Sequence, residues 1–232
     1  MSSSHTSIVI LEAEIDSIHQ SLLTWWQENN ADFPWRRFIP IWQAIVAEIM
    51  LQRTKAEQVV PVFREFQRRY QSAAQFSEAT RQELKELMRP LGLGWRTDGV
   101  YELARAAALN SGRFPSDVAS LQKLKGVGPY VAAAVSSLHA GHRAVIIDSN
   151  VVRVLCRLIG SNYGPETRRK AWLKDLADKL TPEDARSYNY ALLDLAMKVC
   201  VPRTPACEMC PLIKSCVTGR TTTSIDPVTE MA

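Results

Sequence analysis

The apolar residues of this chain recur every three or four positions along most of its length, which is the period of an amphipathic helix. The segment 12–29 shows the pattern clearly, with Ile15, Ile18, Leu22 and Trp25 on one face. No run of alternating residues is long enough to predict a sheet, so the pattern predicts an all-α fold. The other predicted helices span 41–51, 56–70, 81–88, 98–110, 148–159, 165–180 and 181–197, and a short helix opens at Ser116.

Turn-forming residues separate the predicted helices. Phe33-Pro34-Trp35 interrupts the pattern before residue 41, and a turn is predicted from Pro90 to Gly94. The segment 121–138 is divided into two helical pieces by Gly126-Val127-Gly128. The last residues, 220–232, are polar, and we expect them to form a loose tail.

Composition adds little to this picture. The 232 residues suit one large domain or two packed lobes, and 46% hydrophobic with 22% charged residues is ordinary for a soluble protein. The formal net charge of +4 permits nucleic-acid binding but does not require it. The apolar run 8–11 is too short for a membrane span or an export signal, so we expect a cytoplasmic protein, close to the nucleoid in a prokaryote.

The cysteines are unevenly distributed. Cys156 lies in an apolar run and is predicted to be a small core residue, whereas the other four follow the pattern Cys200-x6-Cys207-x2-Cys210-x5-Cys216. A chain without an export signal does not depend on disulfides, so clustered thiols indicate a bound metal. Thiolates suit tetrahedral zinc as well as an iron–sulfur cluster. The flanking gaps favour the iron–sulfur cluster, with zinc as the alternative.

The glycine turn is the second candidate for chemistry. Two glycines one residue apart let the backbone bend sharply and bring amide N–H groups close to an external anion. Pro129 fits the first turn of the helix that follows. The segment therefore predicts a sequence-independent contact with a DNA phosphate through Lys125, Gly126, Val127 and Gly128. A simple connection between helices is the alternative.

Two carboxylates occupy unusual positions. Glu48 lies within the apolar helix 41–51, and burial disfavours the ionised form of a carboxyl group, as a general acid requires. The alternative is a structural ion pair between Glu48 and Arg53. Asp148 stands where an apolar run ends and the helix 148–159 begins, which predicts an N-cap. A capping carboxylate stays ionised and can also stabilise a developing cation, so the two roles are compatible.

Together these motifs resemble the helix-hairpin-helix (HhH-GPD) DNA glycosylase superfamily, which includes endonuclease III, adenine DNA glycosylase and the thymine mismatch glycosylases. The resemblance is carried by the four cysteines and the segments 48–54, 124–130 and 147–154. It implies a [4Fe–4S] cluster and two helical lobes with a DNA-binding cleft between them. A six-helix barrel with the hairpin would span 36–143, and an iron–sulfur lobe would combine 1–35 with 144–219, followed by the flexible tail 220–232.

The resemblance also implies roles for individual residues. Glu48 would activate the departing base, Asp148 would stabilise the oxocarbenium-like sugar and help to position water, and Asn150 would assist near the sugar. Tyr130 stands where bifunctional members have lysine, and tyrosine cannot form a Schiff base, so we expect no strand cleavage by an AP-lyase reaction. Further DNA contacts are expected at Gln52, Arg53, Leu93 and Arg153.

The target base is predicted from local differences between branches of the superfamily. Arg53-Thr54 and Leu91-Gly92-Leu93 favour the mismatch branch, which removes thymine or uracil opposite guanine. Phe33-Pro34-Trp35 resembles the adenine branch, so removal of adenine opposite guanine or 8-oxoguanine is the alternative. A non-catalytic iron–sulfur protein that binds DNA structures is a third possibility. We expect a monomer that binds double-stranded DNA with a mismatched or damaged base and passes its product to an AP endonuclease.

Overall fold

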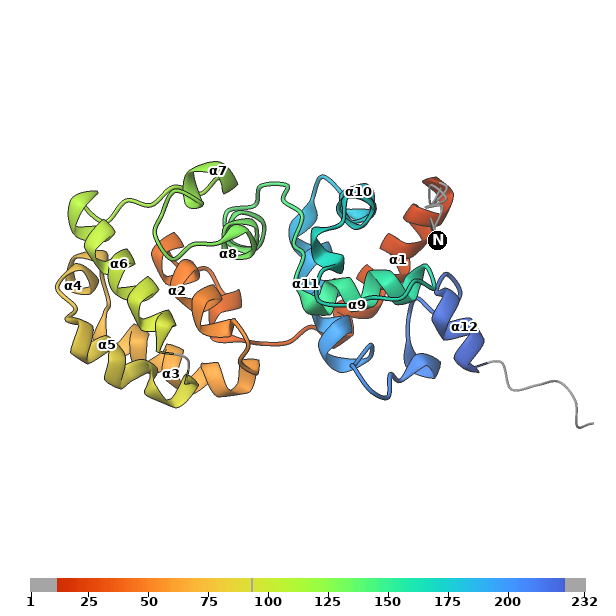
Figure 1. Ribbon diagram of the computed structural model, residues 1–232, viewed down its shortest axis with the longest axis horizontal. Helices are drawn as coiled ribbons and strands as arrows, with labels where there is room; N and C mark the ends of the chain where they lie inside the picture. Colours follow the sequence, from red (N-terminus) through yellow and green to blue (C-terminus); the bar gives the residue numbers. More distant parts are fainter. Residues whose placement is uncertain (1–11, 93, 224–232) are drawn as a thin grey trace, which may run out of the picture. The chain divides into compact units, whose positions relative to one another are not determined.

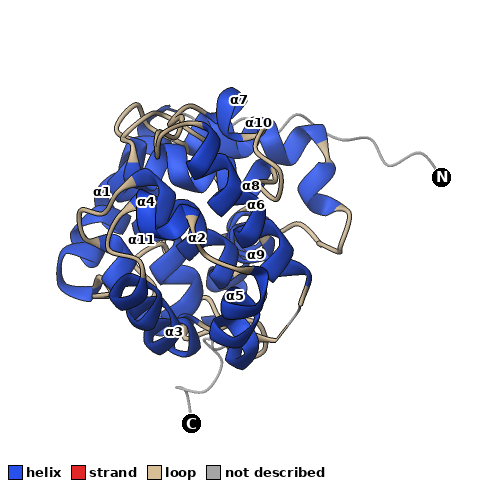
Figure 2. Cartoon of the chain, turned by 90° about the vertical axis from the view of Figure 1, so that its left-hand side faces the viewer, coloured by secondary structure: helices blue, strands red, loops and turns tan. Residues whose placement is uncertain are grey.

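The computed structural model describes residues 12–92 and 94–223. All regular secondary structure in these residues is helical, as Figure 2 shows, which confirms the predicted all-α class. The chain divides into two compact units, one formed by Met1–Ala31 with Val145–Ala232 and the other by Asp32–Ala144. No helix within the described ranges is both long and apolar enough to cross a membrane.

The unit Asp32–Ala144 is organised around α2 (Ile41–Leu51), from which nearly every side chain is buried. A helix that is apolar on all sides must be surrounded by other elements, and α3, α6, α8 and the π-helical turn η3 all pack against α2. The helices of this unit, coloured orange to green in Figure 1, are α2, α3 (Ala56–Arg69), α4 (Ala73–Ser77), α5 (Arg81–Met88), α6 (Trp95–Leu109), α7 (Val118–Leu121) and α8 (Pro129–Ala134), joined by the 3-10 turns η1 (Pro34–Arg36) and η2 (Arg89–Leu91) and followed by η3 (Val135–His139).

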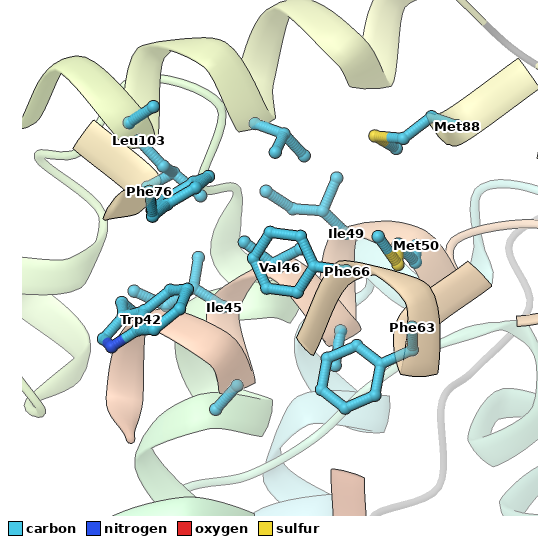
Figure 3. Close-up of a cluster of buried hydrophobic side chains, with 14 of the residues drawn as sticks. Trp42, Ile45, Val46, Ile49, Met50, Phe63, Phe66, Phe76, Met88 and Leu103 are labelled. Carbon is cyan, nitrogen blue, oxygen red and sulfur yellow. The ribbon is translucent and has the colours of Figure 1, made fainter. Parts of the chain in front are cut away.

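Aromatic side chains fill the space around α2. Trp42 stacks on Phe76 of α4 with 5.2 Å between ring centroids, and Phe66 of α3 meets both rings edge-on. Figure 3 shows Ile45, Val46 and Ile49 of α2 in the same cluster, with Phe63, Met88 and Leu103 contributed by the surrounding helices. Because α2 is packed from several sides, any side chain that it carries is held in a fixed position.

The second unit contains α1 (Glu12–Asn29), α9 (Ser149–Leu158), α10 (Ala171–Leu180), α11 (Ala185–Lys198) and α12 (Val217–Thr223), with the short turns η4 (Thr167–Arg169) and η5 (Cys207–Met209). In this unit α11 packs against both α1 and α9. Asp194 of α11 is completely buried and accepts hydrogen bonds from Trp26 Nε1 at 2.9 Å and from the amide of Ala31 at 3.1 Å. These bonds tie the C-terminal end of α1 to the core of its unit.

Several details differ from the sequence prediction. The helices expected over 165–180 and 181–197 begin later, at Ala171 and Ala185, and η4 (Thr167–Arg169) precedes the first of them. The short helix begins at Val118, and its N-cap is Asp117, whose carboxylate accepts from the amide of Ser120 at 2.9 Å, so the expected start at Ser116 was wrong. Helix α4 was not predicted, because its five residues are too few to show a period. Helix α12 occupies 217–223 and packs against α9, so the expected loose tail from residue 220 was wrong for residues 220–223, whereas 224–232 lie outside the described residues.

Candidate active site

Glu48 lies on α2 and is only 2% exposed, as its apolar neighbours in the sequence suggested. The hydroxyl of Tyr130 lies 3.4 Å from its Oε2 atom, and the imidazole Nε2 atom of His139 lies 3.6 Å from its Oε1 atom. Arg53 is exposed, in a left-handed conformation with φ 56°, and no ion pair joins it to Glu48 in the described part of the chain. The alternative of a Glu48–Arg53 pair is therefore wrong.

Tyr130 follows Pro129 at the start of α8 and is half-buried. Its hydroxyl is the donor directed at Glu48, at a distance that is long for an O–H···O bond. Hydrogen bonds in catalytic sites are often long without substrate and shorten when it binds. A phenol can donate a hydrogen bond to a carboxyl group and so orient it, but it has no amine with which to attack a sugar.

The two glycines of the hairpin differ in backbone conformation and in what surrounds them. Gly126 has φ 88°, and a Cβ atom added there would lie 2.7 Å from the Cα atom of Gly99 on α6. Gly128 has an ordinary φ of −83°, and a Cβ atom there would meet nothing within 4 Å. Val127 between them is buried and anchors the turn. Gly126 therefore permits close packing inside the unit, whereas Gly128 leaves the backbone open to an external group.

Lys125 precedes the turn, with its side chain 78% exposed. Its Nζ atom lies 3.1 Å from a carboxylate oxygen of Glu102 on α6. An exposed pair of this kind contributes little to stability, so the ammonium can exchange this partner for a phosphate at small cost. The expected DNA contact at Lys125 stays a prediction.

Asp148 is the N-cap of α9, as its sequence position suggested. Its Oδ1 atom accepts from the amides of Asn150 at 2.9 Å and Val151 at 2.7 Å, and its Oδ2 atom accepts from Asn150 Nδ2 at 2.8 Å. Three donors and the positive end of the helix dipole stabilise the carboxylate and fix its direction. In this structure Asn150 therefore holds the carboxylate of Asp148, through both its backbone amide and its side chain.

Arg153 holds Asn150 in turn. Its Nη1 atom donates to Asn150 Oδ1 at 3.0 Å, while Nε and Nη2 donate to the carbonyls of Cys200 at 2.7 Å and Ala196 at 2.9 Å. The residue is only 5% exposed. In the structure each of its three nitrogens donates within its own unit, so the side chain braces Asn150, and the DNA contact expected at Arg153 stays a prediction.

The segment after α2 contains further expected DNA contacts. Gln52 is half-buried at the C-cap of α2 and Arg53 is exposed, whereas Leu93 lies outside the described residues. Sequence reasoning missed Arg96, which is 1% exposed and donates from Nη1 to the carbonyl of Met50 at 2.7 Å. A cation there stabilises the C-terminal end of α2. Burial, followed by the charge of Arg53, lowers the pKa of Arg96.

The four clustered cysteines line one small cavity of about 30 Å³, together with apolar residues of α9 and α11. All four are half-buried and none forms a disulfide. Burial raises the pKa of Cys210 to about 11, and the other three cysteines reinforce the shift, so the thiols are near neighbours. Cys156 is separate and completely buried, with its pKa also raised by burial to about 11.

Two of these sulfurs accept hydrogen bonds from positively charged or backbone donors. The Nη1 atom of Arg157 lies 3.4 Å from Cys200 Sγ, and the amide of Gly219 lies 3.3 Å from Cys216 Sγ. Such donors favour thiolate ligands. Among residues 12–92 and 94–223, however, no three His, Cys, Asp or Glu side chains are arranged to hold a metal ion.

Comparison with known proteins identifies the class. Residues 46–190 match the model of the HhH-GPD superfamily base excision DNA repair proteins. The chain is 35% identical over 215 residues to the thymine-DNA glycosylase of Aeropyrum pernix, covering 89% of this chain and 96% of that protein. It is 34% identical to the thymine/uracil-DNA glycosylase of Pyrobaculum aerophilum, covering 83% and 86%. The solved structure of a thermostable thymine-DNA glycosylase superposes with a TM-score of 0.82 at 31% identity, covering 90% of this chain and 98% of that one.

The chain therefore belongs to the HhH-GPD superfamily of base excision DNA repair proteins. These comparisons confirm the DNA glycosylase class that the sequence motifs predicted. The adenine branch is also related, since the human adenine DNA glycosylase is 30% identical over 222 residues, but the chain spans only 40% of that protein.

Proposed function

We propose that the chain is a monofunctional DNA glycosylase that removes thymine or uracil mispaired with guanine. Water is consumed, the N-glycosidic bond is broken, and the products are a free base and an abasic site. The observation that carries the proposal is the Glu48–Tyr130 contact of 3.4 Å, which pairs a buried carboxyl group with a phenol where a lyase has an amine. An AP endonuclease would then process the abasic site.

The proposed reaction divides the chemistry between two carboxyl groups. Glu48, excluded from water, is suited to give a proton to the departing base. Asp148, surrounded by three donors, is suited to remain ionised and to stabilise the positive charge that develops on the sugar. The target nucleotide must first leave the duplex, because its glycosidic bond is otherwise inaccessible. The hairpin amides around Gly128 would contact a phosphate of the bound duplex.

The preference for thymine or uracil is supported by the relatives that share nearly the whole chain, since these are named for thymine or uracil. Thymine differs from uracil by one methyl group, and a pocket that accepts the larger base discriminates weakly against the smaller one. The adenine relative matches over less than half of its own length. Adenine removal is therefore kept as an outcome of the test.

We also propose that the four cysteines hold a [4Fe–4S] cluster. The residues fit this group because four thiols share one cavity, with Arg157 and Gly219 as donors to two of the sulfurs. In a tetrahedral zinc site all four sulfurs bind one ion, and a Zn–S bond of about 2.3 Å places the sulfurs about 3.8 Å from one another. In a [4Fe–4S] cluster each thiolate would bind a different iron atom. The cluster would link the chain segments that carry the cysteines.

Purified protein tests the cluster directly. A [4Fe–4S] protein is brown, absorbs broadly near about 400 nm and contains four irons and four sulfides per chain. A colourless protein with one bound zinc would overturn the assignment and establish the alternative. Replacing Cys207 with serine should lower the iron content and the thermal midpoint together.

The activity is tested with four duplexes that contain a G:T, G:U, A:G or A:8-oxoguanine pair, followed by alkali to cleave abasic sites. We expect product from G:T and G:U and no cleavage before alkali. Product from the two adenine duplexes alone would establish the adenine alternative. Binding without cleavage of any duplex would establish the non-catalytic alternative, and the Glu48→Gln variant provides the inactive control.

A further inference from the structure

His139 is a buried histidine that faces the carboxyl group of Glu48. Both side chains are only 2% exposed, and 3.6 Å separates His139 Nε2 from Glu48 Oε1. The Nε2 atom has no hydrogen-bond partner in the described structure. Because a buried polar nitrogen without a partner is costly, its position beside a buried carboxyl group points to an interaction between the two.

The backbone explains how His139 reaches this position. Helix α8 continues directly into the π-helical turn Val135–His139, where the amide of Ala140 bonds to the carbonyl of Val135 at 3.1 Å. A π-helical turn adds one residue to the helical repeat and so redirects the side chains that follow, and such turns are frequent at functional sites. Tyr130 and His139 thus come from opposite ends of one helical segment and approach opposite oxygens of Glu48.

The other elements packed against α2 bring different groups to it. The guanidinium of Arg96 on α6 is directed to the carbonyl of Met50, and Arg36 of η1 lies over the ring of Phe33. On α3, Gln67 donates to Gln43 of α2, a neutral contact. In the described part of the unit, the ionisable side chains in contact with the Glu48 carboxyl group are those of Tyr130 and His139.

We propose that His139 is a positioning residue for Glu48, which deepens the proposed function and rests on it. When Glu48 gives its proton to the departing base, a carboxylate is left in a buried position. The Nε2–H group of His139 and the hydroxyl of Tyr130 are the donors that stabilise this carboxylate. The attacking water forms the new bond to the sugar and releases one proton, which restores the acid. His139 therefore makes Glu48 a better proton donor without touching the DNA.

Three variants test the role of His139. His139→Ala removes the donor, His139→Gln replaces it with an amide donor, and His142→Gln changes an exposed histidine three residues further along. For His139→Ala we expect a single-turnover rate on G:T duplex lower by about tenfold or more, with the duplex Kd close to wild type. The alkaline limb of its pH–rate profile should move to higher pH, because the carboxylate has lost a donor.

The controls separate positioning from packing. His139→Gln should recover part of the rate, and His142→Gln should match the wild type in rate and profile. A His139→Ala rate within about twofold of wild type, or a pH profile that does not move, would overturn the proposal. A loss of rate that follows a loss of folding or of DNA affinity in both His139 variants would assign the residue to packing instead.

A measurement without substrate keeps this test independent of the proposed function. NMR can follow the ring resonances of the four histidines, and the His139 resonance is the one absent from His139→Gln. Because the Nε2 atom of His139 faces the carboxyl group of Glu48, Glu48→Gln should shift the His139 ring resonances more than those of the other three histidines. Unmoved His139 resonances refute the pairing, whereas an inactive wild type with moved resonances refutes only the proposed function.

Discussion

Gly126 of the hairpin offers a quantitative test of how the turn is built. In Gly126→Ala the new methyl group would lie 2.7 Å from Gly99 Cα and 3.4 Å from the carbonyl carbon and oxygen of Gly99. These are backbone atoms of α6, so no side-chain rotation relieves the contact. The residue would also keep the φ of 88°, which disfavours any L side chain.

The expected cost has two parts. A left-handed conformation costs an L residue about 1–2 kcal/mol, and forcing extra volume into a packed region costs about 1–3 kcal/mol. A loss of about 3 kcal/mol in the free energy of unfolding is the central expectation. For a chain of this size it lowers the thermal midpoint by about 6–12 °C.

Gly128→Ala is the matched control, two residues away in the same turn. With an ordinary φ of −83° and no atom within 4 Å of the new methyl group, its free energy of unfolding should change by less than about 0.5 kcal/mol. The methyl group would nevertheless occupy the open side of the turn, where the proposed phosphate must approach. We therefore expect weaker DNA binding without loss of stability.

Urea unfolding followed by circular dichroism measures the first effect, and fluorescence anisotropy with a labelled duplex at fixed salt measures the second. A Gly126→Ala variant as stable as the wild type would refute the close-packing argument. A Gly128→Ala variant with unchanged stability and unchanged affinity would show that the hairpin does not contact phosphate. Gly99→Ala should be tolerated, because its methyl group would lie at 3.5 Å from Gly126.

Four further changes have defined outcomes. Asp148→Asn should abolish release of base in the alkali assay while duplex affinity stays within about threefold, because asparagine still caps α9; surviving turnover would remove Asp148 from the mechanism. Tyr130→Lys should introduce strand cleavage that borohydride traps as a covalent complex, and absence of trapping would place this residue away from the sugar. Arg153→Met should cost about 3 kcal/mol in urea unfolding, because carbonyls bound by the guanidinium lose their donors; a neutral result would contradict the bracing role. Burial raises the pKa of the Cys156 thiol to about 11. Because the unfolded thiol ionises first, stability should be complete below about pH 8.5 and fall as pH rises toward 11, with a smaller slope in Cys156→Ala.

The sequence predicted those features that depend on local spacing. The bounds of α1, α2 and α5 agree with the predicted helices, because their apolar period is long or their limits are set by turn residues. Asp148 was identified as an N-cap from its position alone, and its hydrogen bonds to the amides of Asn150 and Val151 confirm that identification. The burial of Glu48 followed from its apolar neighbours in the same way.

The features that the sequence did not predict depend on contacts between distant segments. His139 and Glu48 are 91 positions apart, and the packing of the π-helical turn η3 against α2 brings them together. The hydrogen bonds of Arg153 could not be predicted from local spacing, because its carbonyl partners lie more than 40 positions further along. One signal was available for His139, since an ionisable residue that follows the segment 131–138, made only of apolar residues and two serines, needs a partner if it is buried.

Helix α9 connects two parts of the proposed chemistry. Its first turn fixes Asp148, and the whole helix, ten residues and about 15 Å long, presents Arg153 and then Arg157 to the cysteine segment. The carbonyl of Arg157 in turn accepts from the Cys216 thiol at 3.3 Å. Oxidative damage to the cysteines would therefore disturb the partners of both arginines and, through the helix, the direction of the Asp148 carboxylate. Repair capacity in such a protein would decline with oxidative stress even when every residue that touches DNA is intact.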